Sequence, residues 1–445
     1  MLDVDGVVPY KSIRTGHPAW RRAAVGLLLC AMVAGCGSSA GTGSTTSPPT
    51  SSSGQIVVEP MTTVNVSAKT GYFSDPFPVQ PWLSKVSASA SQSFSGTTQA
   101  LMTCTGSIQA GCFQATPVSV NYSSLQGQAN AVGATIESNE NNAIFQDQSG
   151  TWQMSTVLVV AKTANPSAGS WNVIAHATPA SSGSGIPTQW TCDAVLEGSF
   201  AQSAPGNYGA KYFEDSGNLY LVYVAHVESQ PFSENGIVAQ QMTSPKLPAA
   251  SSPVVLLKPT DTNGGFNSEY SQVDYSSDTF KLIETGNITV VDGIYVMAYS
   301  VGYYNEPDYK AGLAFSDTFL PSAGSYYQKI LKTDTAGVWG QAGNPEVQYI
   351  LQSQQSAWPN YVAAQVLAPG VPSVEQDASG NWRLFFAGYA PSDAPTSPSQ
   401  GAGHYDGSHR RPFFINLQVN IPSGSTVAGT TNEELANWIM PAVSQ

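Results

Sequence analysis

Hydrophobic and polar residues alternate in four stretches of the chain that repeat one small unit. Each unit reads as a hydrophobic strand, a tight turn with Asp and Gly, and a second strand with an aromatic residue near its start. The four units are AIFQDQSGTWQM (143–154), AKYFEDSGNLYLVYV (210–224), ITVVDGIYVMAYS (288–300) and PSVEQDASGNWRLFFAGY (372–389). A single hairpin cannot bury its hydrophobic face, so the repetition predicts that these hairpins pack together as blades around an axis.

The spacing of the units predicts how many blades there are. The turn glycines Gly150, Gly217, Gly293 and Gly380 lie 67, 76 and 87 residues apart. Further strands are expected at 157–163, 236–242, 309–320 and 410–419. About 385 residues at about 77 per blade give about five blades, so one more blade must come from 60–130. We therefore predict an all-β, five-bladed β-propeller over 60–445, with an irregular pair of β-sandwiches as the alternative.

The N-terminus has the features of a targeting segment. Three arginines precede the apolar run 23–35, which is too short to be a stable membrane anchor. The run ends in Val33-Ala34-Gly35-Cys36, which resembles a bacterial lipoprotein signal, cleaved before a cysteine that then carries lipid. We expect a signal peptide at 1–35, lipidation of Cys36 and a Ser/Thr/Gly/Pro-rich tether at 36–59. An ordinary secretory signal cut nearby is the alternative.

The composition agrees with export. The formal net charge is −13, and without the predicted signal peptide 13 basic and 28 acidic residues remain, a net charge of −15. Only 11% of the residues are charged, and neutral polar residues are abundant. This surface disfavours nucleic acid, which needs a basic stripe, and suits neutral polar ligands. We expect an exported monomer that contacts the membrane only through its lipid, at the outer membrane in a Gram-negative cell.

The cysteines and histidines limit the chemistry. Cys104 and Cys112 are the expected disulfide, because the loop between them is short and export is oxidising, which leaves Cys192 unpaired. The chain has no CxxC or HExxH pattern, so we expect neither a metal centre with sulfur and nitrogen ligands nor a required cofactor. A structural calcium bound through oxygen ligands stays open. The catalytic chemistry is therefore expected from carboxylates.

The segment KLIETGNITVVDGIYVMAYS (281–300) carries a family resemblance. Glu284 precedes the turn Gly293 by nine residues, and Tyr295, Tyr299 and Ser300 follow in the same register. This pattern resembles the acid-bearing blade of glycoside hydrolase family 43, five-bladed propellers that include arabinanases, arabinofuranosidases and β-xylosidases. Thr285-Gly286 stands where that family usually has Gly-Pro. The likeness extends over about 140–420 and is strongest in this blade.

The resemblance implies an inverting hydrolase of pentose-containing glycans, of the plant type or related to it. Glu284 would be the general acid, and Asp75, in the one Asp-Pro pair of GYFSDPFPVQPW (71–82), would be the general base. Inversion places the two carboxyl groups about 6.5–9.5 Å apart, so that water fits between them. A Glu284 satisfied by backbone amides and Asp75-Pro76 as an ordinary turn are the alternative interpretations.

In that family, a third carboxylate orients the acid and raises its pKa. It should lie near Asn207 or Tyr208, where this chain has no carboxylate. Either Asn207 and Lys211 replace it, or Asp193 or Glu197 reaches in from the preceding strand; we take Asp193 as the candidate. The fifth blade departs too, with Gly370-Val371 where the family often has Gly-His.

The candidates for substrate binding are Asn207, Lys211, Tyr303 and Arg410. Tyr303 could stack on a sugar ring, although blade packing is the usual role of such aromatic residues. Arg410 or Arg411 stands where the family has an arginine that points into the pocket. Three classes of function remain open: a lipid-anchored glycosidase, a carbohydrate-binding propeller without activity, and an envelope scaffold that binds proteins.

Overall fold

The computed structural model describes residues 55–444 apart from several gaps. The longer gaps are 81–85, 93–97, 202–206, 229–232, 260–268, 270–279, 332–346, 354–365 and 394–404, and the shorter ones are 66, 68–69, 106, 167–168, 182, 184, 308 and 378. The predicted signal peptide, Cys36 and most of the tether lie outside the described residues. No helix within the described part is long and apolar enough to cross a membrane.

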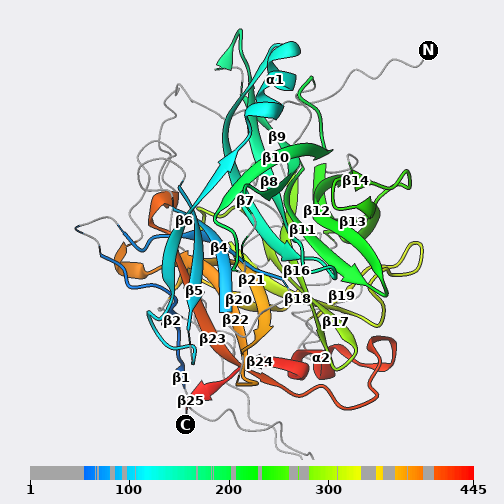
Figure 1. Cartoon of the computed structure of the whole chain (residues 1–445). Helices are drawn as coiled ribbons and strands as arrows, with labels where there is room; N and C mark the ends of the chain where they lie inside the picture. Colours follow the sequence, from blue (N-terminus) through cyan, green and yellow to red (C-terminus); the bar gives the residue numbers. More distant parts are fainter. Residues whose placement is uncertain are drawn as a thin grey trace, which may run out of the picture.

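The strands form five antiparallel blades that follow one another around a central axis as in a β-propeller, and pairing between blades joins the first and second, and the third and fourth, into larger sheets (Figure 1). Blade 1 is formed by β3 (Ser74–Pro78), β4 (Val86–Gln92), β5 (Thr98–Cys104) and β6 (Gln114–Asn121). Blade 2 is formed by β7 (Ala134–Gln146), β8 (Trp152–Lys162), β9 (Ser170–Pro179) and β10 (Gln189–Glu197). The first blade thus lies within 60–130, where it was expected.

The other three blades follow in chain order. Blade 3 contains β11 (Tyr208–Asp215), β12 (Asn218–Glu228), β13 (Ser233–Ser244), β14 (Leu247–Pro248) and β15 (Val254–Leu257). Blade 4 contains β16 (Phe280–Val291), β17 (Ile294–Val301), β18 (Lys310–Ser316), β19 (Gln328–Lys329) and β20 (Tyr349–Gln352). Blade 5 contains β21 (Leu367–Gln376), β22 (Trp382–Tyr389), β23 (Arg411–Val419) and β24 (Ile439–Pro441). The five-bladed propeller predicted from the repeats is confirmed.

The four predicted hairpins are the two inner strands of blades 2 to 5. In blades 3 and 4 the turns have two central residues, both with positive φ. In blades 2 and 5 an Asp side chain replaces a backbone partner, as Asp147 Oδ1 does by accepting hydrogen bonds from the backbone N–H groups of Ser149 and Thr151. Gly150 then takes a φ of +80°, which a residue with a Cβ rarely adopts. The prediction of a separate strand at 157–163 is wrong, because these apolar residues continue β8 and the third strand of blade 2 is β9.

The N-terminal end of the described chain closes the ring. β2 (Glu59–Pro60) pairs antiparallel with β23 of the last blade, and β1 (Gln55–Ile56) pairs with β25 (Val443–Ser444). Parallel pairs also join neighbouring blades: the outer strands β6 and β10 pair with each other, and β13 of blade 3 pairs with the start of β16, the innermost strand of blade 4. Residues 55–59, which we assigned to the tether, therefore belong to the propeller. Ile56 explains why, since its side chain is buried in the core between blades 4 and 5.

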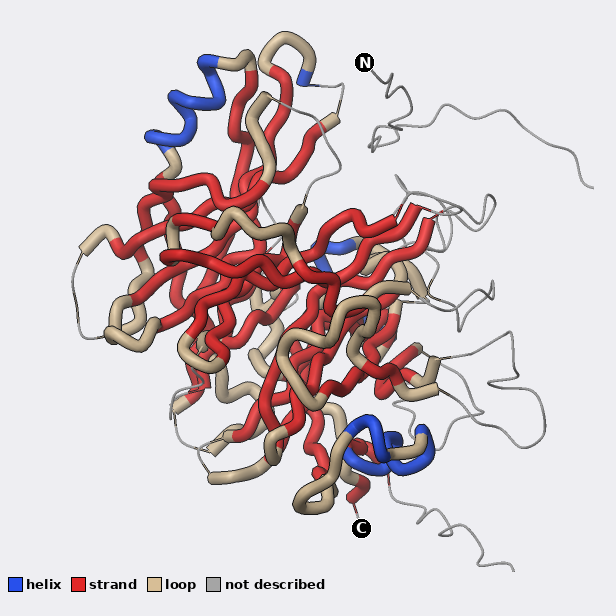
Figure 2. The backbone as a smooth tube through the Cα atoms, turned by 90° about the vertical axis from the view of Figure 1, so that its right-hand side faces the viewer, coloured by secondary structure: helices blue, strands red, loops and turns tan. Residues whose placement is uncertain are grey.

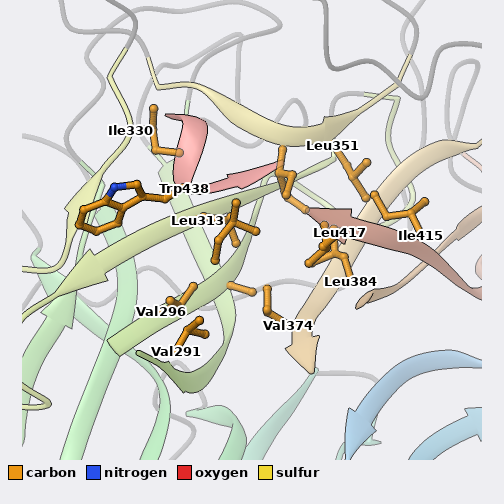
Figure 3. Close-up of a cluster of buried hydrophobic side chains, with 14 of the residues drawn as sticks. Val291, Val296, Leu313, Ile330, Leu351, Val374, Leu384, Ile415, Leu417 and Trp438 are labelled. Carbon is orange, nitrogen blue, oxygen red and sulfur yellow. The ribbon is translucent and has the colours of Figure 1, made fainter. Parts of the chain in front are cut away.

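Hydrophobic cores lie between neighbouring blades. The core between blades 4 and 5 contains Val296 and Leu313 from one blade and Leu384 and Ile415 from the other (Figure 3). Trp438 of helix α2 (Asn432–Trp438) covers one end of this core. Helix α1 (Ser123–Ala131) connects blades 1 and 2, and the two helices lie at opposite ends of a body made mostly of strands (Figure 2).

The innermost strands form a ring around the axis. These strands are β3, β7, β11, β16 and β21, and each contacts the innermost strands of the two adjacent blades, with β3 touching both β7 and β21. Side chains from different blades therefore meet at the axis, far apart in sequence but close in space.

Candidate active site

All five innermost strands carry a β-bulge at the same place. The register shifts fall between Ser74 and Phe77, Glu140 and Ala143, Tyr208 and Lys211, Glu284 and Asn287, and Gly370 and Ser373. The second residue of each bulge has a positive φ, namely Asp75 (53°), Asn141 (49°), Gly209 (63°), Thr285 (58°) and Val371 (55°). Four of these five are not glycine, and such strained backbone is concentrated at functional sites.

The bulges show which residues of the five blades are equivalent. Ser74, Glu140, Tyr208, Glu284 and Gly370 each stand directly before the residue with positive φ. Blades 2, 3 and 4 therefore present Glu140, Tyr208 and Glu284 from equivalent positions, and blade 1 adds Asp75 one residue later. Bulges aim side chains away from the regular ladder, and here they gather three carboxylates from three blades.

Glu284 is held by two tyrosine hydroxyl groups. Tyr208 donates a hydrogen bond of 2.7 Å to its Oε2, and Tyr309 donates one of 2.5 Å to its Oε1. Burial raises the pKa of Glu284, and the negative charge of Asp75 raises it further, while the two tyrosine hydroxyls lower it. The carboxyl group thus sits where its protonated form is favoured, as a general acid requires.

Ser300 fixes the backbone beside Glu284. It pairs with Glu284 across β16 and β17, and its hydroxyl contacts that of Thr285 at 2.6 Å. The same hydroxyl accepts a hydrogen bond of 2.7 Å from the backbone N–H of Val371 in blade 5. One fully buried hydroxyl therefore links the strained bulges of blades 4 and 5. The register of Ser300 with Glu284 and Gly293 explains why this blade was the most readable in the sequence.

Asp75 lies between a cation and an amide. Its Oδ1 is 3.3 Å from Nη1 of Arg410, and its Oδ2 accepts a hydrogen bond of 3.3 Å from Asn141. Burial raises the pKa of Asp75, and Arg410, Lys211 and Asn141 oppose this by stabilising the carboxylate. Its side chain keeps 26% of its surface exposed, so it can reach a bound water or substrate.

Lys211 is a second cation at the same site. Its Nζ donates hydrogen bonds to the carbonyl oxygens of Gly209 (3.0 Å) and Gly286 (3.5 Å) and lies 4.3 Å from the centre of the Phe77 ring. Burial lowers the pKa of Lys211 to about 7, although the charges of Asp75 and Glu284 act to raise it. Lys211 also lines a small cavity of about 30 Å³ between the inner strands, past the bulges.

Arg410, not Arg411, is the arginine of the site. Its side chain is 2% exposed, bonds Asp75 and the carbonyl oxygen of Ala387, and lies over the rings of Tyr304 and Tyr309. Arg411 points elsewhere, over the ring of Tyr72. Tyr303, the predicted stacking residue, is partly exposed and packs against Tyr304 at 5.3 Å between ring centres.

Asp193 does not belong to the site, which corrects its assignment as the residue that tunes Glu284. It lies on β10, the outer strand of blade 2, and is occupied by His176 at 2.5 Å and Lys246 at 2.7 Å. Glu197, the other candidate, ends the same strand and accepts a hydrogen bond from Asn207. Asn207 therefore contacts Glu197 and not Glu284. Neither carboxylate can reach the axis from β10, whichever face of the sheet it points to, because the other strands of blade 2, with β7 innermost, lie between β10 and the axis.

Glu140 is the site residue that sequence reasoning missed. Burial raises its pKa to about 7, with a further contribution from the negative charge of Asp75. Its signal was present, since Glu140 precedes the turn Gly150 by ten residues, as Gly370 precedes Gly380. The third carboxylate of the site thus comes from blade 2, and blade 3 supplies Tyr208 instead.

None of the three described cysteines takes part in the contacts of this site. Cys104 forms a disulfide with Cys112, and Cys192 is free and buried. Among the described residues, no group of three or more His, Cys, Asp or Glu side chains is arranged to hold a metal ion.

These side chains are arranged for general acid and general base catalysis of the cleavage of a substrate bond. Glu284 is poised to carry a proton, and Arg410, Lys211 and Asn141 stabilise the carboxylate form of Asp75 against the burial that raises its pKa. Glu284 comes from blade 4 and Asp75 from blade 1. The charge of Asp75 raises the pKa of Glu284, but their hydrogen bonds described above go to different partners. A proton donor and a proton acceptor at one end of the axis are what hydrolysis by a positioned water requires.

The fold is similar to solved structures of glycoside hydrolases. An α-L-arabinofuranosidase from Lactobacillus brevis shares 13% identity over 78% of this chain and 91% of its own, with a TM-score of 0.51. A thermostable family-43 glycoside hydrolase shares 17% over 81% and 94%, with a TM-score of 0.49. An exo-1,5-α-L-arabinanase from a bovine ruminal metagenomic library shares 15% over 78% and 94%, with a TM-score of 0.46.

No protein-family model and no curated protein matches the sequence. At identities this low, structural similarity establishes the fold and leaves the activity to be argued from the site. The resemblance to family 43 that the sequence indicated is confirmed at the level of the five-bladed propeller.

Proposed function

We propose that the protein is an exported, lipid-anchored glycoside hydrolase that cleaves O-glycosidic bonds of pentose-containing glycans with inversion. Glu284 protonates the leaving oxygen, and Asp75 takes a proton from the attacking water. The observation that carries this proposal is the meeting of these two carboxyl groups from blades 4 and 1, within the field of the same two cations, Arg410 and Lys211. The similarity of the fold to that of an α-L-arabinofuranosidase supports the choice of pentose-containing substrates.

The first experiment compares two substrates in Glu284→Gln. A general acid contributes about 10²–10⁴-fold to rate when the leaving group is poor, and an amide cannot supply the proton. Turnover of natural glycosides should fall by that factor, while aryl arabinofuranosides or xylosides with an activated leaving group should lose much less. Asp75→Asn is the matched variant, because loss of the base should slow both substrate types alike.

Two outcomes contradict the assignment. Equal losses on both substrates in Glu284→Gln would remove the acid role from this residue. A parent protein that binds oligosaccharides and hydrolyses none of them would favour a carbohydrate-binding propeller. Tyr208, at the blade 3 position where a carboxylate was expected, supports this alternative. The anomer released first, followed by proton NMR, tests inversion separately.

The location has its own test. If Cys36 carries lipid, the parent protein should be recovered with membranes and Cys36→Ser should be released in soluble form. A Cys36→Ser protein that is still processed and still bound to membranes would show that lipid anchoring is wrong. We include in the proposal that the enzyme acts as a monomer and needs no cofactor.

A further inference from the structure

Tyr208 is the bulge residue of blade 3 and contacts Glu284 at the axis. Its bulge is equivalent to that of Glu284 in the next blade, so the two side chains leave adjacent inner strands at the same level. The hydroxyl of Tyr208 lies 2.7 Å from Oε2 of Glu284. The side chain is only partly buried, and a tyrosine here is neutral where a carboxylate would be charged.

The two tyrosines that hold Glu284 differ in freedom. Tyr309 is fully buried, and its ring fills the space where a Cβ of Gly370 would stand, at 1.9 Å. Its hydroxyl is further tied to Ser300, so Oε1 of Glu284 is fixed on the closed side. Tyr208, the partner of Oε2, is by contrast partly exposed. The proton that reaches a substrate must therefore leave from Oε2.

We propose that Oε2 of Glu284 carries the transferable proton and that Tyr208 is the positioning residue that holds this oxygen throughout the reaction. This proposal rests on the proposed glycosidase function and specifies which atom and which partner perform its acid step. Before transfer, the hydroxyl of Tyr208 donates its hydrogen bond to a lone pair of the protonated Oε2, which leaves the proton on Oε2 directed at the leaving oxygen. After transfer, the hydroxyl donates to the Oε2 carboxylate.

The step balances as follows. Asp75 takes a proton from water, the water oxygen bonds to the anomeric carbon, and the bond from that carbon to the leaving oxygen breaks. The leaving oxygen receives the proton from Oε2, so Glu284 ends as a carboxylate and Asp75 as an acid. Tyr208 then stabilises the new charge through a charge-assisted hydrogen bond. Solvent returns the proton from Asp75 to Glu284.

The charges that face Glu284 set the expected pH behaviour. They come from Asp75 in blade 1, Lys211 in blade 3 and Arg410 in blade 5, in addition to the hydroxyls of Tyr208 and Tyr309. A donor to the carboxylate lowers the pKa of Glu284. Tyr208→Phe removes that donor and raises the pKa. Because the acid works in its protonated form, activity should then persist to higher pH.

The experiment measures kcat/KM against pH in the parent, Tyr208→Phe and Tyr295→Phe. Tyr208→Phe should move the alkaline limb upward by about one pH unit and lower the rate on poor leaving groups about tenfold. Tyr295→Phe is the matched control, because Tyr295 also donates its hydroxyl to a carboxylate, that of Asp215, at the turn end of β11 and seven residues beyond the bulge residue Tyr208. It should leave the profile unchanged. Circular dichroism verifies that each variant is folded.

A second measurement does not depend on activity. In protein labelled with ¹³C at the Glu side-chain carboxyl carbon, the signal lost in Glu284→Gln identifies Glu284, and its titration gives the pKa in the parent and in Tyr208→Phe. A parent that hydrolyses no glycoside would contradict the proposed function, and an upward shift of this pKa would still support the hydrogen bond. An active parent whose alkaline limb and Glu284 titration are both unchanged by Tyr208→Phe would overturn the role of Tyr208. A purely structural tyrosine would lower activity without moving either.

Discussion

At the scale of single residues, the properties of the site depend on which of its carboxyl groups are ionised. Glu140, Glu284 and Asp75 all have their pKa raised by burial, and Arg410 and Lys211 lie among them. Ionising all three carboxyl groups at one end of the axis would cost free energy through charge repulsion and burial, so one or more keep their protons near neutral pH. Of the three, Asp75 forms the ion pair with Arg410, which stabilises its carboxylate form against the effect of burial. The acid and base roles follow from these neighbours.

The stability of the protein should depend on Glu140 in a predictable way. The pKa of Glu140 is about 7 in the folded protein and near 4.5 without its surroundings. The folded state therefore holds the proton more tightly, so the contribution of Glu140 to stability is complete below pH 4.5 and is lost as the pH rises through 7. Glu140→Gln should be more stable than the parent at pH 8, by about 1–2 kcal/mol, and no more stable at pH 4.5.

Urea unfolding at the two pH values measures this difference. Glu137→Gln is the control, because Glu137 lies on the same strand, β7, with its side chain exposed. Equal effects of the two substitutions at pH 8 would show that Glu140 carries no penalty from the axial site. The same Glu140 variant should also ease ionisation of Asp75 if the two carboxyl groups repel each other.

At the scale of elements, the sequence predicted hairpins well and bulges poorly. Asp147 and Gly150, or Asp377 and Gly380, mark a turn by local chemistry alone, so the hairpins of blades 2 to 5 were readable. The bulges put Thr285 and Val371 at positive φ, where β-branched residues are rarely found, so propensity argues against them. They persist because tertiary contacts such as those of Ser300 hold them. Local rules cannot foresee a backbone that is fixed from the neighbouring blade.

The same limit explains which site residues were found. Glu284 was predicted because its strand, turn and following aromatics keep one register, and Asp75 because it forms an Asp-Pro pair. Asp193 was misplaced because a carboxylate near blade 3 in sequence lies on the outer strand of blade 2 in space. Tyr208 and Glu140 required knowing that the bulges are equivalent, which the spacing before Gly217 and Gly150 only suggests.

At the scale of the whole molecule, closure of the ring determines how accurately the site is assembled. Asp75 lies in blade 1 and Arg410 directly before β23 in blade 5, so their ion pair spans the place where the first and last blades meet. Strands β1 and β2 fasten that place by pairing with β25 and β23. Loss of this fastening should therefore affect both the stability of the fold and the geometry of the base.

Ile56 allows this link to be tested with a matched neighbour. Ile56 is 5% exposed and packs into the core between blades 4 and 5, whereas Val57 is 46% exposed. Ile56→Ala should lower the free energy of unfolding by about 2–3 kcal/mol through lost burial and the cavity left behind, and Val57→Ala should change it little. If residues 55–59 were only tether, neither substitution would matter. Thermal and urea unfolding measure the stabilities, and kcat/KM at low pH, where ionisation of Asp75 limits the rate, shows whether a loosened closure also disturbs the Asp75–Arg410 pair.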